Sequence, residues 1–164
     1  MNKGQRHFDA SISVPATSAE VFAYADDHKN FSSHMNQSSW MMTGGKMTTE
    51  VDKGRGQEIG SHIKMRGNVL GLELSLDEVI TEHNPPHRKV WKTVGEPKLL
   101  VIGNYSLGFE INPEKEKSHV TVFIDYDLPV SPRTRFLGYL FGNVYTKWCV
   151  EQMLSGITQQ FSKK

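Results

Sequence analysis

The last part of the chain predicts one long amphipathic helix, and this helix limits the folds that the rest can adopt. Ser131-Pro132-Arg133 places a capping residue before a proline at the first helical position. Apolar residues then recur at the spacing of one helix face, at Leu137, Leu140, Phe141, Val144, Tyr145, Trp148, Cys149, Met153, Ile157 and Phe161. About thirty residues at ~1.5 Å each make a rod of about 45 Å, which needs a long apolar surface to pack on.

The earlier part of the chain can supply that surface, because its apolar residues alternate with polar ones at the period of a β-strand. Seven segments have this pattern, with turn residues between most of them: 8–14, 46–51, 59–66, 70–76, 89–94, 99–111 and 120–128. The leucines at 70, 72, 74 and 76 give the clearest alternation, and Asn112–Ser118 predicts a charged hairpin loop. Consecutive antiparallel hairpins are the simplest topology for such a series.

Two short helices are expected between the first strand and the rest. Thr17 and Glu20 have the spacing of a capping box, so a helix of about two turns should follow. Asp26 or Asp27 can cap a second short helix across 28–35. Neither helix is long enough to be stable alone, so both should lean on the sheet.

Composition and charge exclude several classes of protein. The 164 residues suit one domain, 1–164, with a full core. Nineteen basic against eighteen acidic residues leave a net charge of +1, which argues against nucleic-acid binding. The single cysteine, Cys149, rules out an internal disulfide and a four-cysteine zinc site. Without an apolar signal segment at the start or any transmembrane run, a cytoplasmic location is expected.

The order of strand, two short helices, six strands and long terminal helix resembles the START-like superfamily, also called SRPBCC or helix-grip. Ile12-Ser13-Val14-Pro15-Ala16 leading into Ala19-Glu20-Val21-Phe22 is similar to the opening of its polyketide cyclase/dehydrase and lipid-transport branch, as are Gly54-x-Gly56 with Gly60, and 137–149. The resemblance covers essentially the whole chain and implies an α+β helix-grip fold, in which a strongly curved antiparallel sheet of about seven strands (β-α-α-β6-α) wraps around the C-terminal helix. It also implies a cavity between sheet and helix.

A cavity of this kind, lined by apolar side chains, would bind a hydrophobic small molecule or lipid, and possible transport of that ligand follows from the same reading. Large aromatic residues could instead fill the gap completely. The residues expected to line the cavity lie on the apolar parity of their strands or on the apolar helix face: Met65, Leu72, Leu74, Trp91, Tyr105, Leu107, Ile124, Phe141, Tyr145 and Trp148. Two alternatives stay open: a cyclase/dehydrase-like enzyme, and a protein-interaction module of the co-chaperone type.

Catalytic motifs are absent from the sequence, so whether the protein is an enzyme stays open. Tyr105, Tyr126 and Tyr145 are weak candidates for assisting proton transfer, although each is more simply a core tyrosine. Cys149 is expected to be a small buried residue rather than a nucleophile. His83 and His87 are separated by two prolines, which prevents the single helical face that a zinc pair would use. No metal and no cofactor are therefore expected.

One segment of the terminal helix, Phe136 to Gly142, is apolar on nearly all sides. The simplest expectation is that the short helices bury it. Alternatively it forms a lid over the cavity mouth, touches a membrane, or contacts a partner, which could be a second copy in a homodimer.

Overall fold

The computed structural model describes residues 4–30, 46–69 and 71–162. Its elements follow the order strand, helix, six strands, helix. They are β1 (Arg6–Val14), α1 (Ser18–Asp26), β2 (Lys46–Val51), β3 (His62–Val69), β4 (Leu72–Asn84), β5 (Arg88–Lys98), β6 (Tyr105–Glu114), β7 (Lys117–Tyr126) and α3 (Pro132–Phe161). The order and the helix-grip class agree with the sequence prediction. Residues 31–35 of the predicted second helix lie outside the described residues.

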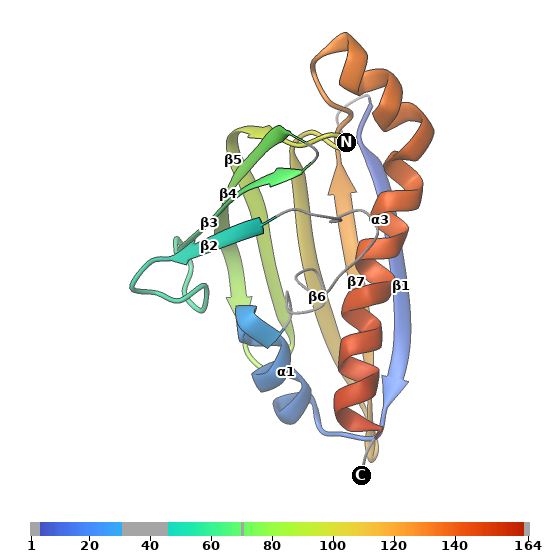
Figure 1. The fold of residues 1–164 in the computed structure, drawn as a ribbon. Helices are drawn as coiled ribbons and strands as arrows, with labels where there is room; N and C mark the ends of the chain where they lie inside the picture. Colours follow the sequence, from blue (N-terminus) through green and yellow to red (C-terminus); the bar gives the residue numbers. More distant parts are fainter. Residues whose placement is uncertain (1–3, 31–45, 70, 163–164) are drawn as a thin grey trace.

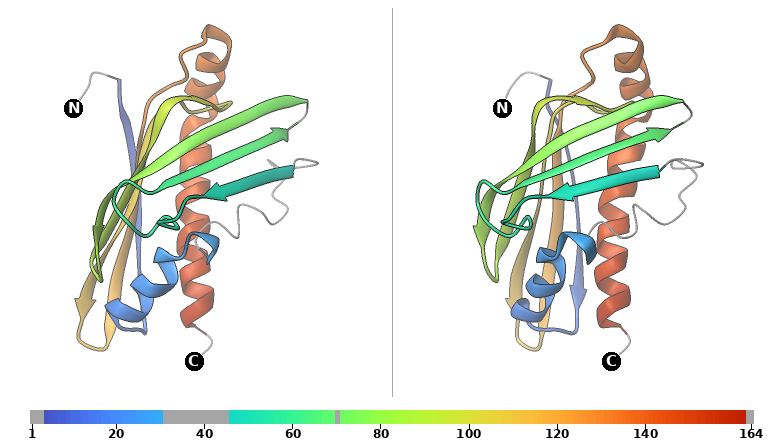
Figure 2. Two further views of the ribbon diagram at one scale, coloured as in Figure 1. Left: turned by 90° about the vertical axis from the view of Figure 1, so that its left-hand side faces the viewer. Right: turned by 60° about the vertical axis from the view of Figure 1, so that its left-hand side comes forward.

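The seven strands form one antiparallel sheet in the order β1-β7-β6-β5-β4-β3-β2. Each strand from β2 to β6 pairs with the next strand in the chain, and β1 pairs with β7 at the edge of the sheet, with Phe8 opposite Ile124. The sheet is strongly bent, and both α1 and α3 lie on its concave side, with α3 running along β1 and β7 (Figures 1 and 2).

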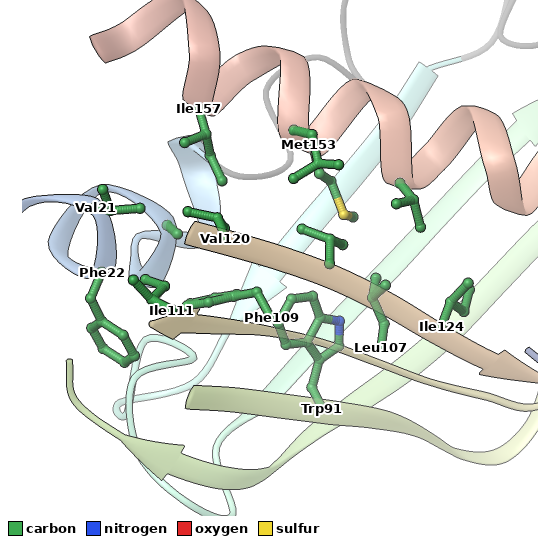
Figure 3. Packing of buried hydrophobic residues seen from close by; sticks show 14 of the residues in the cluster. Val21, Phe22, Trp91, Leu107, Phe109, Ile111, Val120, Ile124, Met153 and Ile157 are labelled. Atoms are coloured by element: carbon green, nitrogen blue, oxygen red, sulfur yellow. The ribbon is translucent and has the colours of Figure 1, made fainter. Parts of the chain in front are cut away.

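The core lies between α3 and the inward-facing residues of β5, β6 and β7. Figure 3 shows Leu107, Phe109, Val120 and Ile124 beneath Met153 and Ile157 of the helix, and all are buried. Their positions follow the predicted alternation, since side chains of one parity share one face of the sheet. Burial of this kind contributes about 1.5–3 kcal/mol for each large apolar side chain, before cavity and entropy effects.

The predicted caps are present at the start of α1 and at the start of the helical turn that follows it. The Thr17 hydroxyl accepts a hydrogen bond from the Glu20 amide at 3.3 Å, and Glu20 Oε2 accepts one from the Thr17 amide at 2.9 Å. Asp27, one of the two predicted caps, accepts from the Lys29 amide at 2.9 Å and begins a helical turn over 28–30. The capping box therefore fixes the direction in which α1 leaves β1.

Three predicted strand boundaries are wrong. Residues 99–104 form a loop rather than the first half of a long strand, because Gly103 packs against the Leu128 carbonyl and its amide bonds Asp127 O at 2.8 Å. The predicted loop 112–118 is instead a tight turn, since β6 and β7 pair as far as Glu114 and Lys117. Ile59 is 68% exposed in the loop before β3, where Gly60 has a positive φ.

The start of α3 packs through small residues. Gly138 faces the main body so closely that a Cβ there would lie 2.6 Å from Pro129 Cδ and 2.7 Å from Val101 O. A Cβ at Gly142 would lie 3.3 Å from the same carbonyl oxygen. The first turns of the helix thus approach the backbone of the 99–104 loop directly, with no large side chain between them.

Candidate functional site

A buried carboxylate, Glu78 of β4, lies at the centre of the candidate site. Glu78 has the same parity as Leu74, Leu76 and the buried Ile80, so it points to the concave side of the sheet, and it is only 2% exposed. The sequence prediction missed it. Its signal is an acidic residue that continues the leucine alternation, and burying a carboxylate among such neighbours is costly unless it is hydrogen-bonded or protonated.

Tyr105 of β6 reaches across β5 to this carboxylate. Its hydroxyl donates a hydrogen bond to Glu78 Oε1. Thr93 sets the alignment, because it pairs with Glu78 across the β4–β5 ladder and its hydroxyl accepts a hydrogen bond from the Tyr105 amide at 3.1 Å. The second carboxylate oxygen, Oε2, is buried and has no hydrogen-bond partner among the described residues. Glu78 therefore has one oxygen held and one available to a ligand.

The environment of Glu78 moves its pKa toward 7. Burial raises the pKa of Glu78 from 4.5 to about 7, against the opposing effect of the neighbouring Tyr105 hydroxyl and Trp91 side chain. Burial and the Glu78 carboxylate together raise the pKa of Tyr105 well above 10, so its hydroxyl stays protonated. Near pH 7 the pair therefore consists of a protonated tyrosine and a carboxyl group that can either give or take a proton.

The helix side of the site is formed by Tyr145 and Cys149, one turn apart on α3. The Cys149 thiol raises the pKa of Tyr145, as does burial, so this hydroxyl is also neutral. Burial raises the pKa of Cys149 to about 12. The thiol is then protonated at ordinary pH, and Cys149 is buried as predicted. Tyr145 also contacts the Trp148 ring, with centroids 6.2 Å apart.

A second polar cluster lies at the end of α1, on the same concave side. Lys89 of β5 is buried, and its Nζ lies 2.7 Å from Asp26 Oδ1, while His83 Nε2 lies 3.0 Å from the same oxygen. Burial lowers the pKa of Lys89, and burial together with the Lys89 charge lowers that of His28 to about 4. A small pocket with room for about one water lies here, lined by Ala25, His28, Ile63, Ile80, Lys89 and Trp91.

The residues predicted to line a cavity fall into three groups. Trp91, Leu107 and Ile124 are buried in the hydrophobic core. Met65, Tyr105 and Tyr145 pack on the core but keep some exposed surface, as do Leu74 and Trp148. Leu72 and Phe141 are each 52% exposed, Leu72 at the start of β4 and Phe141 one turn before Tyr145. Tyr126, the third catalytic candidate, lies apart from Glu78 and donates to Asn143 Oδ1 at 2.5 Å.

Two inward-facing side chains near Glu78 keep some exposed surface. Met65 has the parity of the buried Ile63, and Tyr105 that of the buried Leu107, yet part of each side chain stays exposed. Glu78 itself is buried on the same concave face of the sheet.

Nothing in the described residues forms a group of three or more His, Cys, Asp or Glu side chains suited to a metal ion. His62, one of the histidines on a polar parity, contacts Asp77 at 2.9 Å on the outer side. The Gly54–Gly60 segment connects β2 to β3, and Asp52 accepts hydrogen bonds from Ser61 and His62 beside it. No helix in 4–30, 46–69 or 71–162 has the length and apolar character to cross a membrane.

Comparison with known proteins places these features in a family. The sequence profile described as "Polyketide cyclase / dehydrase and lipid transport" matches residues 5–161. The chain belongs to this family. A comparison with curated proteins finds no match.

Solved structures share the fold of this family member at low sequence identity. The Zhui aromatase/cyclase of Streptomyces sp. R1128 has a TM-score of 0.71 at 10% identity, covering 97% of this chain and 94% of that one. Norcoclaurine synthase of Thalictrum flavum, in complex with a transition-state analogue, has a TM-score of 0.65 at 13% identity over 97% and 95% of the two chains. A protein of Thermus thermophilus has a TM-score of 0.67 at 14% identity over 96% and 98%. These likenesses show the fold.

Proposed function

We propose that the protein binds a hydrophobic small molecule between the concave side of the sheet and α3, and that Glu78 selects ligands carrying a hydrogen-bonding group. The observation that carries this proposal is Glu78 Oε2, a buried oxygen without a partner among the described residues, set among apolar side chains that keep some exposure. A ligand hydroxyl that donates to Oε2 would satisfy this oxygen, while its apolar body contacts Met65, Tyr145 and Trp148.

The energetics suit a mainly apolar ligand. Burying about 300 Å² of apolar ligand surface at roughly 25 cal/mol per Å² gives about 7–8 kcal/mol before the costs of association. One hydrogen bond to a buried charged acceptor adds about 1.5–3 kcal/mol and, more importantly, discriminates against ligands that leave the oxygen unpaired. Family membership supports this function at the level of ligand class.

A pair of matched probes tests the proposal. 2-Naphthol carries a donor that 2-methoxynaphthalene lacks, and both have the same ring system. We expect the wild-type protein to bind 2-naphthol at least about tenfold more tightly, and Glu78→Leu to bind both equally, as followed by fluorescence titration. Glu73→Leu, at an exposed position of the same strand, is the control. Native mass spectrometry should also find an apolar molecule that copurifies. Absence of any binding, or equal affinity of the two probes for the wild type, would contradict the proposal.

A second candidate, an enzyme of the cyclase/dehydrase kind, is favoured by one observation: Glu78 is a buried acid with a pKa of about 7 beside the Tyr105 hydroxyl. A carboxylate of this kind can remove a proton next to a ketone. The carbon–hydrogen bond breaks, the proton moves to Oε2, and the electron pair passes to the ketone oxygen as an enolate.

Reprotonation from solvent would then return the ketone, so the reaction can be followed as hydrogen exchange in heavy water with an apolar ketone such as 2-tetralone. We expect the wild type to accelerate exchange and Glu78→Gln to abolish the acceleration while still binding 2-naphthol. Equal exchange rates in the two proteins would remove Glu78 from any such chemistry. In that case ligand binding alone would stand.

A further inference from the structure

The first four turns of α3 have their polarity reversed. The side that faces the main body carries Gly138, Gly142 and Thr146, which are buried. Because each residue turns the helix by about 100°, Leu140 and Val144 lie nearly opposite this side, and both are exposed. A helix that only packs on a domain core has the opposite arrangement, with large apolar residues inward and polar residues outward.

Most of the exposed large apolar side chains in the described residues gather at this end of the molecule. We call them the outer patch: Val130, Phe136, Leu137, Tyr139, Leu140, Phe141 and Val144. Phe136 and Tyr139 are each 65% exposed, so the expectation that the short helices bury this segment is wrong. In both Figure 1 and Figure 2 the first turns of α3 project beyond the ends of the strands, which leaves the outer patch accessible.

Basic residues outnumber acidic ones around the outer patch, although Lys147 Nζ also lies 3.8 Å from Glu151 Oε1, one turn further along α3. Residues 128–150 contain Arg133, Arg135 and Lys147 and no aspartate or glutamate, although the whole chain has a net charge of only +1. Arg133 and Lys147 lie near the two ends of the outer apolar stripe. From β1, the Arg6 guanidinium stacks over the Tyr139 ring at 5.2 Å and adds a further cation at the edge. The positive end of the helix dipole lies here as well.

We infer that the outer patch docks this protein on the surface of an anionic lipid bilayer, with Phe136, Leu140 and Val144 in the interfacial region and the arginines and Lys147 on lipid phosphates. Exposed aromatic and aliphatic residues flanked by basic ones are the pattern of a helix that lies in a membrane interface. Anionic lipids attract nearby cations, so the charge and the apolar face act together. A dimer formed through the outer patch would bring the basic residues of the two copies close together, and their repulsion disfavours it. The inference does not depend on the ligand proposed above.

Vesicle cosedimentation tests this directly. We expect the full-length protein to bind vesicles of phosphatidylcholine and phosphatidylglycerol, to bind pure phosphatidylcholine at least about tenfold more weakly, and to be released by about 1 M salt, where the Debye length is about 3 Å. The double variant Phe136→Ser/Leu140→Ser should lose at least about tenfold in binding. Ile59→Ser, which removes an equally exposed apolar side chain from the loop before β3, should bind as the wild type does.

A labelled cysteine reports which surface enters the lipid. Val144→Cys carries an environment-sensitive fluorophore on the outer patch and Ile59→Cys carries it away from it; native Cys149 is buried and has a pKa of about 12, so it should label slowly. We expect the emission to shift to the blue with anionic vesicles only for the label at 144. No vesicle binding, equal binding of the double variant, or a vesicle-independent dimer that the double variant abolishes would each overturn the inference.

Discussion

The Tyr105 hydroxyl on β6 donates to the Glu78 carboxylate on β4, with strand β5 between the two residues. Thr93 of β5 makes this contact possible, because it pairs with Glu78 and accepts the Tyr105 amide hydrogen. The contact therefore depends on the register of three neighbouring strands. It also stabilises the charged carboxylate through Oε1, while Oε2 has no hydrogen-bond partner among the described residues.

The first prediction concerns stability and pH. The pKa of Glu78 rises from 4.5 in the unfolded chain to about 7 in the folded protein, so the folded state holds the proton more tightly. The free energy of unfolding should then fall as the pH rises from 4.5 through 7, by about 3 kcal/mol in total. Glu78→Gln removes this titration. We expect it to gain about 2–3 kcal/mol relative to the wild type between pH 5 and pH 8, measured by urea denaturation.

The control for this prediction is Glu73→Gln on the exposed side, whose stability difference from the wild type should not change over the same range. The difference between variants is needed because His28 acts in the opposite direction. Its pKa falls from 6.5 to about 4 on folding, so its contribution to stability is lost as the pH falls below 6.5. A constant difference between Glu78→Gln and the wild type would show that Glu78 is not a perturbed acid.

The second prediction separates burial from hydrogen bonding at Glu78. Tyr105→Phe removes a donor that favours the charged carboxylate, so the pKa of Glu78 should rise further above its ordinary value. Infrared spectroscopy of the carboxylic acid C=O stretch, as a function of pH, measures this. Tyr126→Phe is the matched control, because that hydroxyl bonds Asn143 rather than Glu78. An unchanged or lowered Glu78 pKa in Tyr105→Phe would contradict the arrangement.

The fold was predictable from the sequence because the alternation of strands and the periodicity of helices are visible in the order of apolar and polar residues along the chain. Strands such as β1 and β7 follow directly from their parity, and α3 begins at Pro132 as the local signals indicate. The loop 99–104 was not predictable in this way. Its residues continue the alternation of β6, and only the contact of Gly103 with the distant Leu128 shows that the chain leaves the sheet there.

The candidate site was predictable only in part. Tyr105 and Tyr145 were identified because aromatic residues on an apolar parity are conspicuous. Glu78 and Lys89 were missed, although Glu78 continues the leucine alternation and Lys89 has the parity of Trp91. A charged residue can be buried only where a partner from another element stabilises it, and here Tyr105 does this for Glu78 and Asp26 for Lys89. The residue pattern of a single strand does not reveal such partners.

The third prediction concerns the buried ion pair of Lys89 and Asp26. Asp26→Ala leaves the Lys89 ammonium buried without its carboxylate, which should cost about 3–5 kcal/mol in the free energy of unfolding. Lys89→Met should cost less, because His83 still contacts Asp26. The double variant should be more stable than Asp26→Ala alone. Urea denaturation of the four proteins forms the double-mutant cycle, and simple additivity would show that the pair is not coupled.

The last prediction compares two glycines of the same helix. Alanine has the higher helix propensity by about 1 kcal/mol, so an unconstrained glycine-to-alanine change in α3 should stabilise the protein. At Gly138 the new Cβ would lie 2.7 Å from the Val101 carbonyl oxygen and 2.6 Å from Pro129, and neither the backbone nor the ring can turn aside.

Gly138→Ala should therefore lose about 1–3 kcal/mol of unfolding free energy, as overpacked cores do. At Gly142 the corresponding distance is 3.3 Å, which a shift of a few tenths of an ångström relieves, so Gly142→Ala should be nearly neutral. Chemical denaturation of the two variants gives the comparison. Equal stabilities would mean that α3 does not approach the 99–104 loop closely at Gly138, and the reversed polarity of its first turns would lose its structural cause.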